Sequence, residues 1–176
     1  MVNSDLVIDF VNTLDLHPYQ ERLDNPRALV VWLSERGLIA PGARATQTDL
    51  AEAVGVREAL RDLIGARNEL PADITASTSV IDAAARRAGL GVRFADGVAR
   101  VEPAVRGVRG ALGRILAEVS AGMADGTWSR IKACRADDCR WAFLDTAKNR
   151  SRAWCSMQTC GNREKVRTYR ERHPSH

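Results

Sequence analysis

The sequence predicts a mainly α-helical body with a small β-hairpin, followed by a C-terminal α+β metal-binding module. Three observations lead to this fold class. Apolar residues recur at helical spacing through most of residues 1–126, one Asp-Gly pair separates two short apolar runs, and all four cysteines lie between positions 134 and 160. We therefore expect two domains, a helical one at residues 1–126 and a cysteine-containing one at residues 127–176.

Four helices are expected in the first half of the chain. The first covers residues 4–14, and the second runs from Asn25, an N-cap followed by proline at the first helical position, to Gly37. The third covers residues 48–68, where alanine and arginine also favour a helix, and a shorter fourth covers residues 77–88.

A hairpin and a fifth helix complete the body. Residues 91–94 and 98–101 flank the Asp-Gly turn signal and are expected to pair as two strands. The fifth helix is expected to begin at Glu102, with glycines inside it that permit close packing, and residues 122–127 are expected to form a linker.

Composition restricts the class of protein. The chain has 176 residues, of which 45% are hydrophobic and 27% are charged, as is usual for globular domains. It contains no apolar run of about 18 residues and no basic start followed by an apolar stretch. We therefore expect no membrane span, no signal peptide and a cytoplasmic location.

The cysteines form two pairs, Cys134 with Cys139 and Cys155 with Cys160, with four residues inside each pair and fifteen between the pairs. Two such knuckles supply the four thiolates of a structural tetrahedral Zn²⁺ site, and a closed ligand set leaves no position for substrate. We predict Zn²⁺ rather than two disulfides, because no export signal is present. We prefer it to an iron–sulfur cluster because the intervals differ from ferredoxin spacings.

The order of elements in this module is that of a treble-clef-like zinc finger. An aromatic strand at residues 140–145 is expected to pair with residues 151–154, and residues 160–172 are expected to form a helix. Three aromatic side chains are expected to pack around the metal: Trp141, Phe143 and Trp154.

Charge is distributed unevenly along the chain. Residues 1–126 contain 14 Lys and Arg against 17 Asp and Glu, a net charge of −3, whereas residues 127–176 contain 12 against 5, a net charge of +7. DNA is therefore an expected partner of the module, and a merely solvated arginine-rich surface is the alternative.

The predicted nucleic-acid-binding residues lie on the last helix and in the loop before it: Arg163, Lys165, Arg167, Arg170, Lys148, Arg150 and Arg152. Arginines at i, i+4 and i+7 share one helical face, which suits a DNA groove. For Arg163 and Asn162 the alternative is a bracing role inside the finger. Val166 and Tyr169 are expected to dock on the hairpin.

Asp9, Asn12 and Thr13 are polar residues set in the apolar first helix. Two interpretations fit them: an effector pocket for a small molecule, or internal hydrogen bonds to backbone and arginine groups. An enzyme is not expected, because the sequence has no nucleophile elbow, phosphate loop or histidine metal motif, and every cysteine is assigned to metal.

Several residues near the last two cysteines closely resemble the CGNR zinc-finger family: Asp145, Lys148, Asn149, Arg152, Trp154, Cys155, Ser156, Met157, Cys160, Gly161, Asn162, Arg163, Lys165 and Tyr169. Thr146 departs from the expected serine and keeps its hydroxyl. Residues 6–14 resemble the opening of the ABATE-type domain that precedes this finger. The resemblance implies a bacterial transcription regulator, often described as stress-induced, with the four cysteines as zinc ligands and a DNA-binding finger.

The favoured function is a DNA-binding transcription regulator that docks electrostatically through its basic helix and loop. The alternative is a zinc-stabilised protein-interaction module whose basic face meets an acidic protein. RNA is not distinguished from DNA by the sequence. A homodimer is favoured, because one small finger contacts few base pairs.

Overall fold

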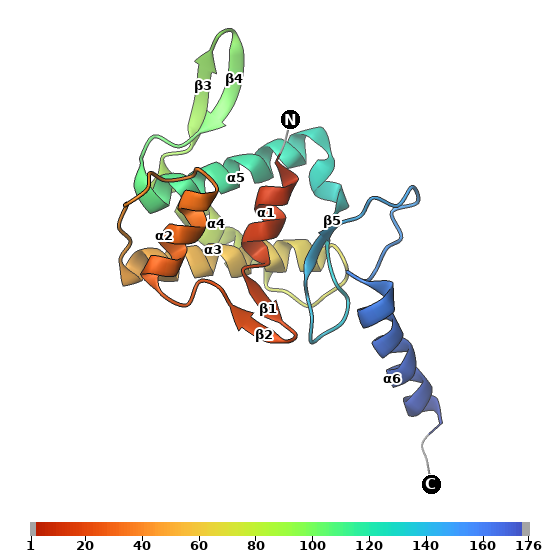
Figure 1. Cartoon of the computed structure of the whole chain (residues 1–176). Coiled ribbons are helices and arrows are strands. Elements are labelled where there is room, and N and C mark those ends of the chain that lie inside the picture. The colour runs from red at the N-terminus through yellow and green to blue at the C-terminus, as the bar shows by residue number, and fades with distance from the viewer. Residues whose placement is uncertain (1–2, 174–176) are drawn as a thin grey trace.

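The computed structural model describes residues 3–173 and confirms a mainly α-helical fold with small antiparallel sheets (Figure 1). The α-helices of this part of the chain are α1 (Ser4–Val11), α2 (Pro26–Glu35), α3 (Gln47–Ala66), α4 (Ile74–Ala88), α5 (Gly107–Asp125) and α6 (Asn162–Arg172). The strand pairs are β1 (Leu14–Leu16) with β2 (Tyr19–Glu21), β3 (Gly91–Ala95) with β4 (Val98–Glu102), and β5 (Ile131–Ala133) with β6 (Ala142–Leu144). A 3-10 turn covers Thr127–Arg130 and a π-turn covers Met157–Gly161.

α3 is the central helix of the body. α1, α2, α4 and α5 all contact it, and their buried apolar side chains form one core. Phe10, Leu29, Leu60 and Ile115 are fully buried members of this core, so removal of apolar area from water is the main source of its stability. Between residues 3 and 173, no helix is both long and apolar enough to cross a membrane.

Two helix starts follow from local capping. The Asn25 side chain accepts a hydrogen bond from the Ala28 N–H at 2.9 Å, as its N-cap position predicts. Thr46 and Asp49 form a capping box at the start of α3, each side chain accepting from the backbone of the other. Both contacts satisfy N–H groups that a helix start leaves without intrahelical partners.

Four predicted boundaries are wrong. The fourth helix begins at Ile74 instead of residue 77, because Asp73 caps it. The first helix ends at Val11 instead of residue 14, because the chain there enters the β1–β2 hairpin. The fifth helix begins at Gly107 instead of Glu102, because Glu102 still pairs within the β3–β4 hairpin. The predicted linker at residues 122–127 is largely helical, since α5 continues to Asp125.

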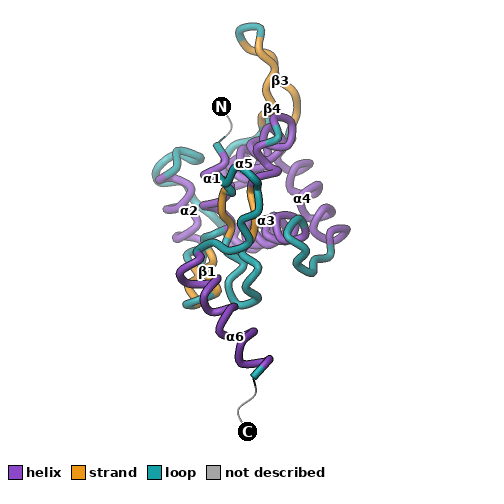
Figure 2. Tube along the Cα trace, turned by 90° about the vertical axis from the view of Figure 1, so that its right-hand side faces the viewer, coloured by secondary structure: helices purple, strands orange, loops and turns teal. Residues whose placement is uncertain are grey.

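The β3–β4 hairpin forms as predicted and projects away from the helical body in both views (Figures 1 and 2). We call residues 91–102 the arm. Apart from the half-buried Gly91, every residue in its two strands is exposed. The arm therefore contributes almost nothing to the core.

The aromatic strand of the C-terminal module pairs with a different segment from the one expected. β6 lies beside β5, with Lys132 opposite Phe143, whereas residues 151–154 were the predicted partner. The later segment approaches the module through a single backbone hydrogen bond, from the Arg135 N–H to the Ala153 carbonyl at 3.0 Å. β5 forms the closer partner because the chain reverses over the first cysteine pair.

Candidate metal centre and basic surface

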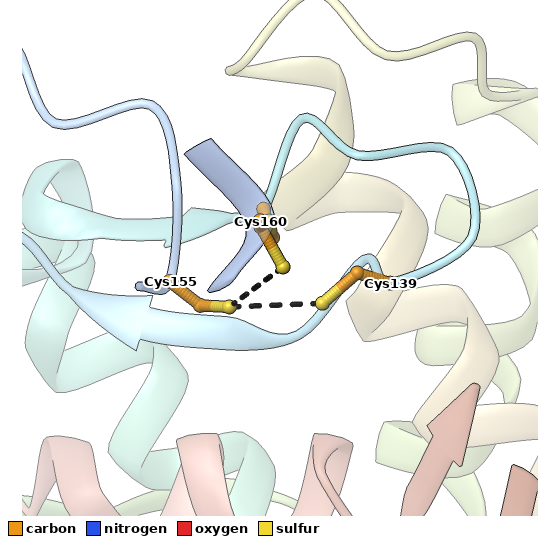
Figure 3. A group of neighbouring side chains, drawn as sticks. Cys139, Cys155 and Cys160 are labelled. Atoms are coloured by element: carbon orange, nitrogen blue, oxygen red, sulfur yellow. Dashed lines mark hydrogen bonds between the residues drawn. The ribbon is translucent and has the colours of Figure 1, made fainter. Parts of the chain in front are cut away.

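Four cysteine sulfurs meet between the β5–β6 hairpin and the start of α6. Figure 3 shows three of these residues, Cys139, Cys155 and Cys160, with their sulfurs directed toward one another. The Sγ atoms of Cys134, Cys139, Cys155 and Cys160 all lie within 4.8 Å of one another, and none is in a disulfide. The Cys139 and Cys155 sulfurs are 3.7 Å apart, and those of Cys155 and Cys160 are 3.6 Å apart. Tetrahedral Zn–S bonds of about 2.3 Å place the sulfurs about 3.8 Å apart, so the donor set fits this ion.

The thiols influence one another's ionisation. The hydrogen bond with Cys139 lowers the pKa of Cys134 to about 5, and the same contact raises the pKa of Cys139 above its ordinary value. Burial, and then contact with Cys160, raises the pKa of Cys155 to about 12. The Cys134 thiol is thus the one that ionises most easily, and its negative charge disfavours ionisation of the neighbouring Cys139 and Cys155 thiols. A divalent cation removes this repulsion, which is the electrostatic reason that such a cluster binds metal.

The first cysteine pair lies on a tight knuckle between β5 and β6. The Cys134 N–H donates to the Trp141 carbonyl and the Cys139 N–H donates to the Ala136 carbonyl, both at 2.9 Å. Arg140 adopts a positive φ of 50°, which reverses the chain into β6. These contacts hold the two sulfurs on one side of the knuckle.

The second pair depends on the π-turn. Cys160 lies inside it and Cys155 lies just before it. A Cβ at Gly161 would overlap the Met157 sulfur and would lie 3.2 Å from the Trp154 ring. A larger residue at position 161 would therefore have to displace the exposed Met157 side chain and press on the Trp154 ring, so the glycine allows the turn to pack closely against its own aromatic neighbour.

Arg163 braces the centre. Its guanidinium lies 3.4 Å from the Cys160 sulfur and donates to the Asp138 carboxylate at 3.1 Å. The structure thus places this residue in the bracing role that was the alternative to DNA contact. The Asn162 side chain, in contrast, donates to the Gln158 carbonyl of its own turn.

Two of the three predicted aromatic neighbours lie beside the cysteines. Trp141 and Trp154 pack against the sulfur cluster. Phe143 is buried elsewhere and lies under the Arg152 guanidinium, 4.6 Å from the ring centroid. The expectation that Phe143 packs around the metal is therefore wrong, because its ring packs against Arg152 and is not among the side chains that contact the cysteine cluster.

An ion pair that sequence reasoning missed fixes the loop after β6. Asp145 is fully buried and its carboxylate lies 2.7 Å from the Lys132 ammonium. Burial would raise the pKa of Asp145, but the hydrogen bond from Lys132 lowers it overall. Lys132 also donates to the backbone carbonyls of Arg150 and Arg152, so one side chain holds both ends of the loop.

The β5–β6 hairpin belongs to the core of the helical body. Three of its side chains, Ile131, Ala133 and Ala142, lie in that core together with Trp128 of the preceding 3-10 turn. Two buried asparagines complete the joint. Asn12 exchanges two hydrogen bonds with the backbone of Ala142, each 2.9 Å long, and Asn68 donates to the Ala133 carbonyl at 2.5 Å. The metal-binding sulfurs therefore link a hairpin embedded in the body to the following loop and α6.

The three residues of the expected effector pocket do not line one site: Asp9 lines a surface cleft between α1, α2, α5 and β4, whereas Asn12 and Thr13 are buried, and binding of an effector stays a prediction. Asn12 and Thr13 are 6% and 0% exposed, and their polar atoms are used internally. The Thr13 hydroxyl donates to the Phe10 carbonyl and accepts from Arg57, while Asp9 lies on the surface and pairs with Arg36 at 3.3 Å. Internal hydrogen bonds, the alternative interpretation, account for both buried residues.

Two arginines of α3 were missed as buried functional groups of the fold. Arg57 is 1% exposed and binds Glu21 through two hydrogen bonds of 2.7 and 2.8 Å. Arg61 is 2% exposed and donates to the carbonyls of Val11 and Leu14, where α1 ends. Both arginines fall on the apolar stripe of the predicted third helix, and that position was the available signal.

The predicted DNA-binding cations divide into two groups. Arg163 and Arg152 are engaged inside the module, and Arg167 is 2.7 Å from Glu164 and 3.6 Å from Asp137. Lys165 and Arg170, by contrast, have no carboxylate within 4.0 Å anywhere in residues 3–173. The same is true, over that range, of Lys148 and Arg150 in the loop and of Arg172 at the end of α6.

α6 extends from the module without burying any of its residues (Figure 1). Val166 and Tyr169, which were expected to dock on the hairpin, are 49% and 64% exposed. That expectation is wrong, because the helix leaves the module along its own axis instead of lying across the sheet (Figure 2). Lys165, Arg170 and Arg172 are therefore exposed, whereas Arg163 at the start of the helix is partly covered by the module.

Two family models match the chain. Residues 4–125 match ABATE, described as "Putative stress-induced transcription regulator", and residues 130–173 match the CGNR zinc finger. The second match contains all four clustered cysteines. A comparison with curated proteins gives no match.

Proposed function

Because this chain belongs to the ABATE family and ends in a CGNR zinc finger, we propose that it is a transcription regulator that binds Zn²⁺ and duplex DNA. The ligands of the metal are Cys134, Cys139, Cys155 and Cys160, whose sulfurs have the spacing of a tetrahedral site. Bound Zn²⁺ supplies no reaction chemistry here, because four thiolates close its coordination shell. It holds the loop and α6 in place on the embedded hairpin.

The observation that carries the DNA proposal is the exposed helix with unpaired cations. Lys165, Arg170 and Arg172 lie on α6 with no carboxylate within reach among the described residues, and Lys148 and Arg150 lie in the adjoining loop. Protein cations that are free of intramolecular partners are available to phosphates without first breaking an ion pair. The last two turns of the helix project beyond the module, so they are accessible to a DNA groove.

Arg167 is a weaker candidate than the sequence predicted. Its guanidinium already lies near Glu164, Asp137 and Glu171, at 2.7, 3.6 and 4.0 Å. These exposed pairs are each worth about 0–1 kcal/mol, but they reduce the net charge that this face offers to phosphate. The proposed phosphate contacts are therefore Lys165 and Arg172, which are seven residues apart and share one face of α6, and Arg170, which lies on the face that also carries Arg167.

The test is binding of the zinc-loaded full chain to a random duplex pool, followed by anisotropy titrations over a range of salt. A triple variant, Lys165→Ala with Arg170→Ala and Arg172→Ala, should bind more weakly. Its slope of log affinity against log salt should fall by about 0.9 for each lost phosphate contact. The zinc content of the purified variant must be measured first, to establish that it still binds one zinc ion per chain.

A matched control is Arg44→Ala, which removes an exposed cation from the helical body that has no carboxylate within 4.0 Å among residues 3–173. It should retain zinc and leave both the affinity and the salt slope nearly unchanged. If the wild type shows no duplex binding above micromolar background at low salt, the proposal fails. The basic surface would then be assigned to an acidic protein partner.

A further inference from the structure

The residues of α6 divide between a side that faces the module and a side that faces solvent. Glu164 and Thr168 are four residues apart, so they share one side of the helix, and both are half-buried. Asn162, Val166 and Tyr169 recur at i, i+4 and i+7 on the other side, and all three are exposed. We call these three residues the outer face. It is the part of α6 that points away from the zinc-binding module.

Charge is arranged around the outer face. Lys165 and Arg172 lie along one edge of it and Arg170 lies along the other, and none of them has a carboxylate within 4.0 Å in the described part of the chain. The two acidic residues of α6, Glu164 and Glu171, lie on the side of the module, at 2.7 and 4.0 Å from the same arginine. An uncharged centre between two cationic edges is complementary to a DNA groove, in which base edges lie between two phosphate backbones.

The Asn162 amide has one donor and one acceptor to spare. Its Nδ2 atom donates one hydrogen to the Gln158 carbonyl at 3.1 Å, and this bond fixes the orientation of the amide. The second Nδ2 hydrogen and the Oδ1 atom have no partner among residues 3–173. An asparagine that reads adenine donates to N7 and accepts from the N6 amino group, so the two free groups of Asn162 are the ones required.

Val166 continues the outer face one turn after Asn162. Its side chain is 49% exposed, and an apolar side chain in this position suits the C5 methyl group of thymine. Both residues border a hollow of about 660 Å³ along the helix, which gives a base edge room to approach. Tyr169 ends the outer face, with its ring stacked on that of His173 at a centroid distance of 4.4 Å. At about 1.5 Å per residue the outer face is about 10 Å long, or about three base pairs of duplex DNA.

We infer that the outer face reads base pairs in the major groove, with Asn162 specifying an adenine and Val166 contacting the methyl group of a nearby thymine. The inference rests on the proposed DNA-binding function and adds to it the residues that select the sequence. The cations on the two edges contact phosphates and contribute affinity without sequence information. Specificity and electrostatic affinity are thus assigned to different residues of one helix.

Selection from a random duplex pool by the zinc-loaded full chain tests this inference. The wild type should enrich a site that contains an adenine and a thymine within about three base pairs of each other. Asn162→Ala should lose the preference for adenine at one position by about 5- to 150-fold, which is the discrimination of one bidentate pair. Val166→Ala should weaken the preference for thymine at another position. Thr168→Ala, on the other side of the same helix, is the matched control and should retain the wild-type site.

The salt dependence separates the outer face from its edges. Asn162→Ala and Val166→Ala remove no cation, so their slope of log affinity against log salt should equal that of the wild type. The triple variant at Lys165, Arg170 and Arg172 should show the opposite pattern, with a smaller slope and an unchanged base preference.

A changed preference separates base reading from a structural role of Asn162. Asn162→Asp keeps the size of the side chain and replaces its amide nitrogen with an acceptor, so the preference at that position should change from adenine to cytosine, whose N4 amino group donates to carboxylates. Both variants at position 162 lose the hydrogen bond to Gln158, so a purely structural role of this bond would affect them alike. Zinc content and circular dichroism of each variant establish that it is folded.

Failure of this inference differs from failure of the proposed function. A wild type that binds no duplex ends both. A wild type that binds duplex DNA but enriches no sequence overturns the base-reading role alone, and so do folded Asn162→Ala and Val166→Ala variants that both enrich the wild-type site. An Asn162→Asp variant that still selects adenine overturns the role of Asn162.

Discussion

Replacing Asn12 with alanine tests the joint between the helical body and the metal-binding hairpin. The Asn12 amide donates to the Ala142 carbonyl and accepts from the Ala142 N–H, both at 2.9 Å. Asn12 is 6% exposed and Ala142 is 1% exposed, so water cannot readily replace the lost amide. The variant leaves one buried donor and one buried acceptor without partners.

The cost follows from these two groups. A buried polar group that loses its partner costs about 1–3 kcal/mol, so the free energy of unfolding should fall by roughly 2–5 kcal/mol. For a chain of this length that corresponds to a decrease in Tm of roughly 5–15 °C. Because β6 follows the Cys139 knuckle directly, zinc should also be released to a competing chelator faster than from the wild type.

Urea unfolding followed by tryptophan fluorescence gives the stability change, and a coloured chelator gives the rate of zinc release. Asn68→Ala, which removes a single hydrogen bond to Ala133, should give about half the loss. Asn149→Ala, in an exposed loop position, should give none. A change below about 0.5 kcal/mol in Asn12→Ala, with unaltered zinc release, would refute the reasoning that this amide joins the two parts.

Three further predictions follow from the structure. Removal of zinc should increase hydrogen–deuterium exchange in residues 155–172, which the metal holds in place. α3 should stay protected from exchange, because β5 and β6 belong to the core of the helical body and do not depend on the metal for their packing. Exchange mass spectrometry that shows loss of protection throughout the chain would contradict this prediction. Gly110→Ala should lower the free energy of unfolding by about 1–3 kcal/mol, because its Cβ would overlap the Val105 carbonyl. Gly55→Ala, whose Cβ would lie 3.8 Å from its nearest neighbour, should raise the free energy of unfolding by up to about 1 kcal/mol, and thermal melts of both variants measure the difference. Burial would raise the pKa of Glu21, but the hydrogen bond from Arg57 lowers this pKa below 4.5, so ionised Glu21 stabilises the fold above pH 4.5 and this stabilisation is lost as the pH falls through the folded pKa. The free energy of unfolding of the metal-free Glu21→Gln variant should therefore decrease less steeply below about pH 4.5 than that of the metal-free wild type. An unchanged pH dependence in that range would exclude Glu21 as a cause.

The sequence alone determined the features that arise from neighbouring residues. The Asn25 cap, the Asp-Gly hairpin turn and the helical spacing of apolar residues each act within a few positions of the chain. The four-cysteine set was equally readable, because only a metal or disulfides explain two such pairs, and the sulfurs do converge. The division into two domains stays a prediction.

Only the tertiary structure decided what each polar side chain does. Asn12 turned from a candidate effector residue into a buried joint with Ala142, which lies 130 residues away in sequence. Arg167 gained carboxylate partners from the knuckle and from its own helix, while Arg170, one turn later, gained none among residues 3–173. The physical reason is that a polar group is satisfied by whatever lies within about 3 Å of it in the folded chain, and sequence spacing fixes that neighbour only for contacts inside one helix or turn.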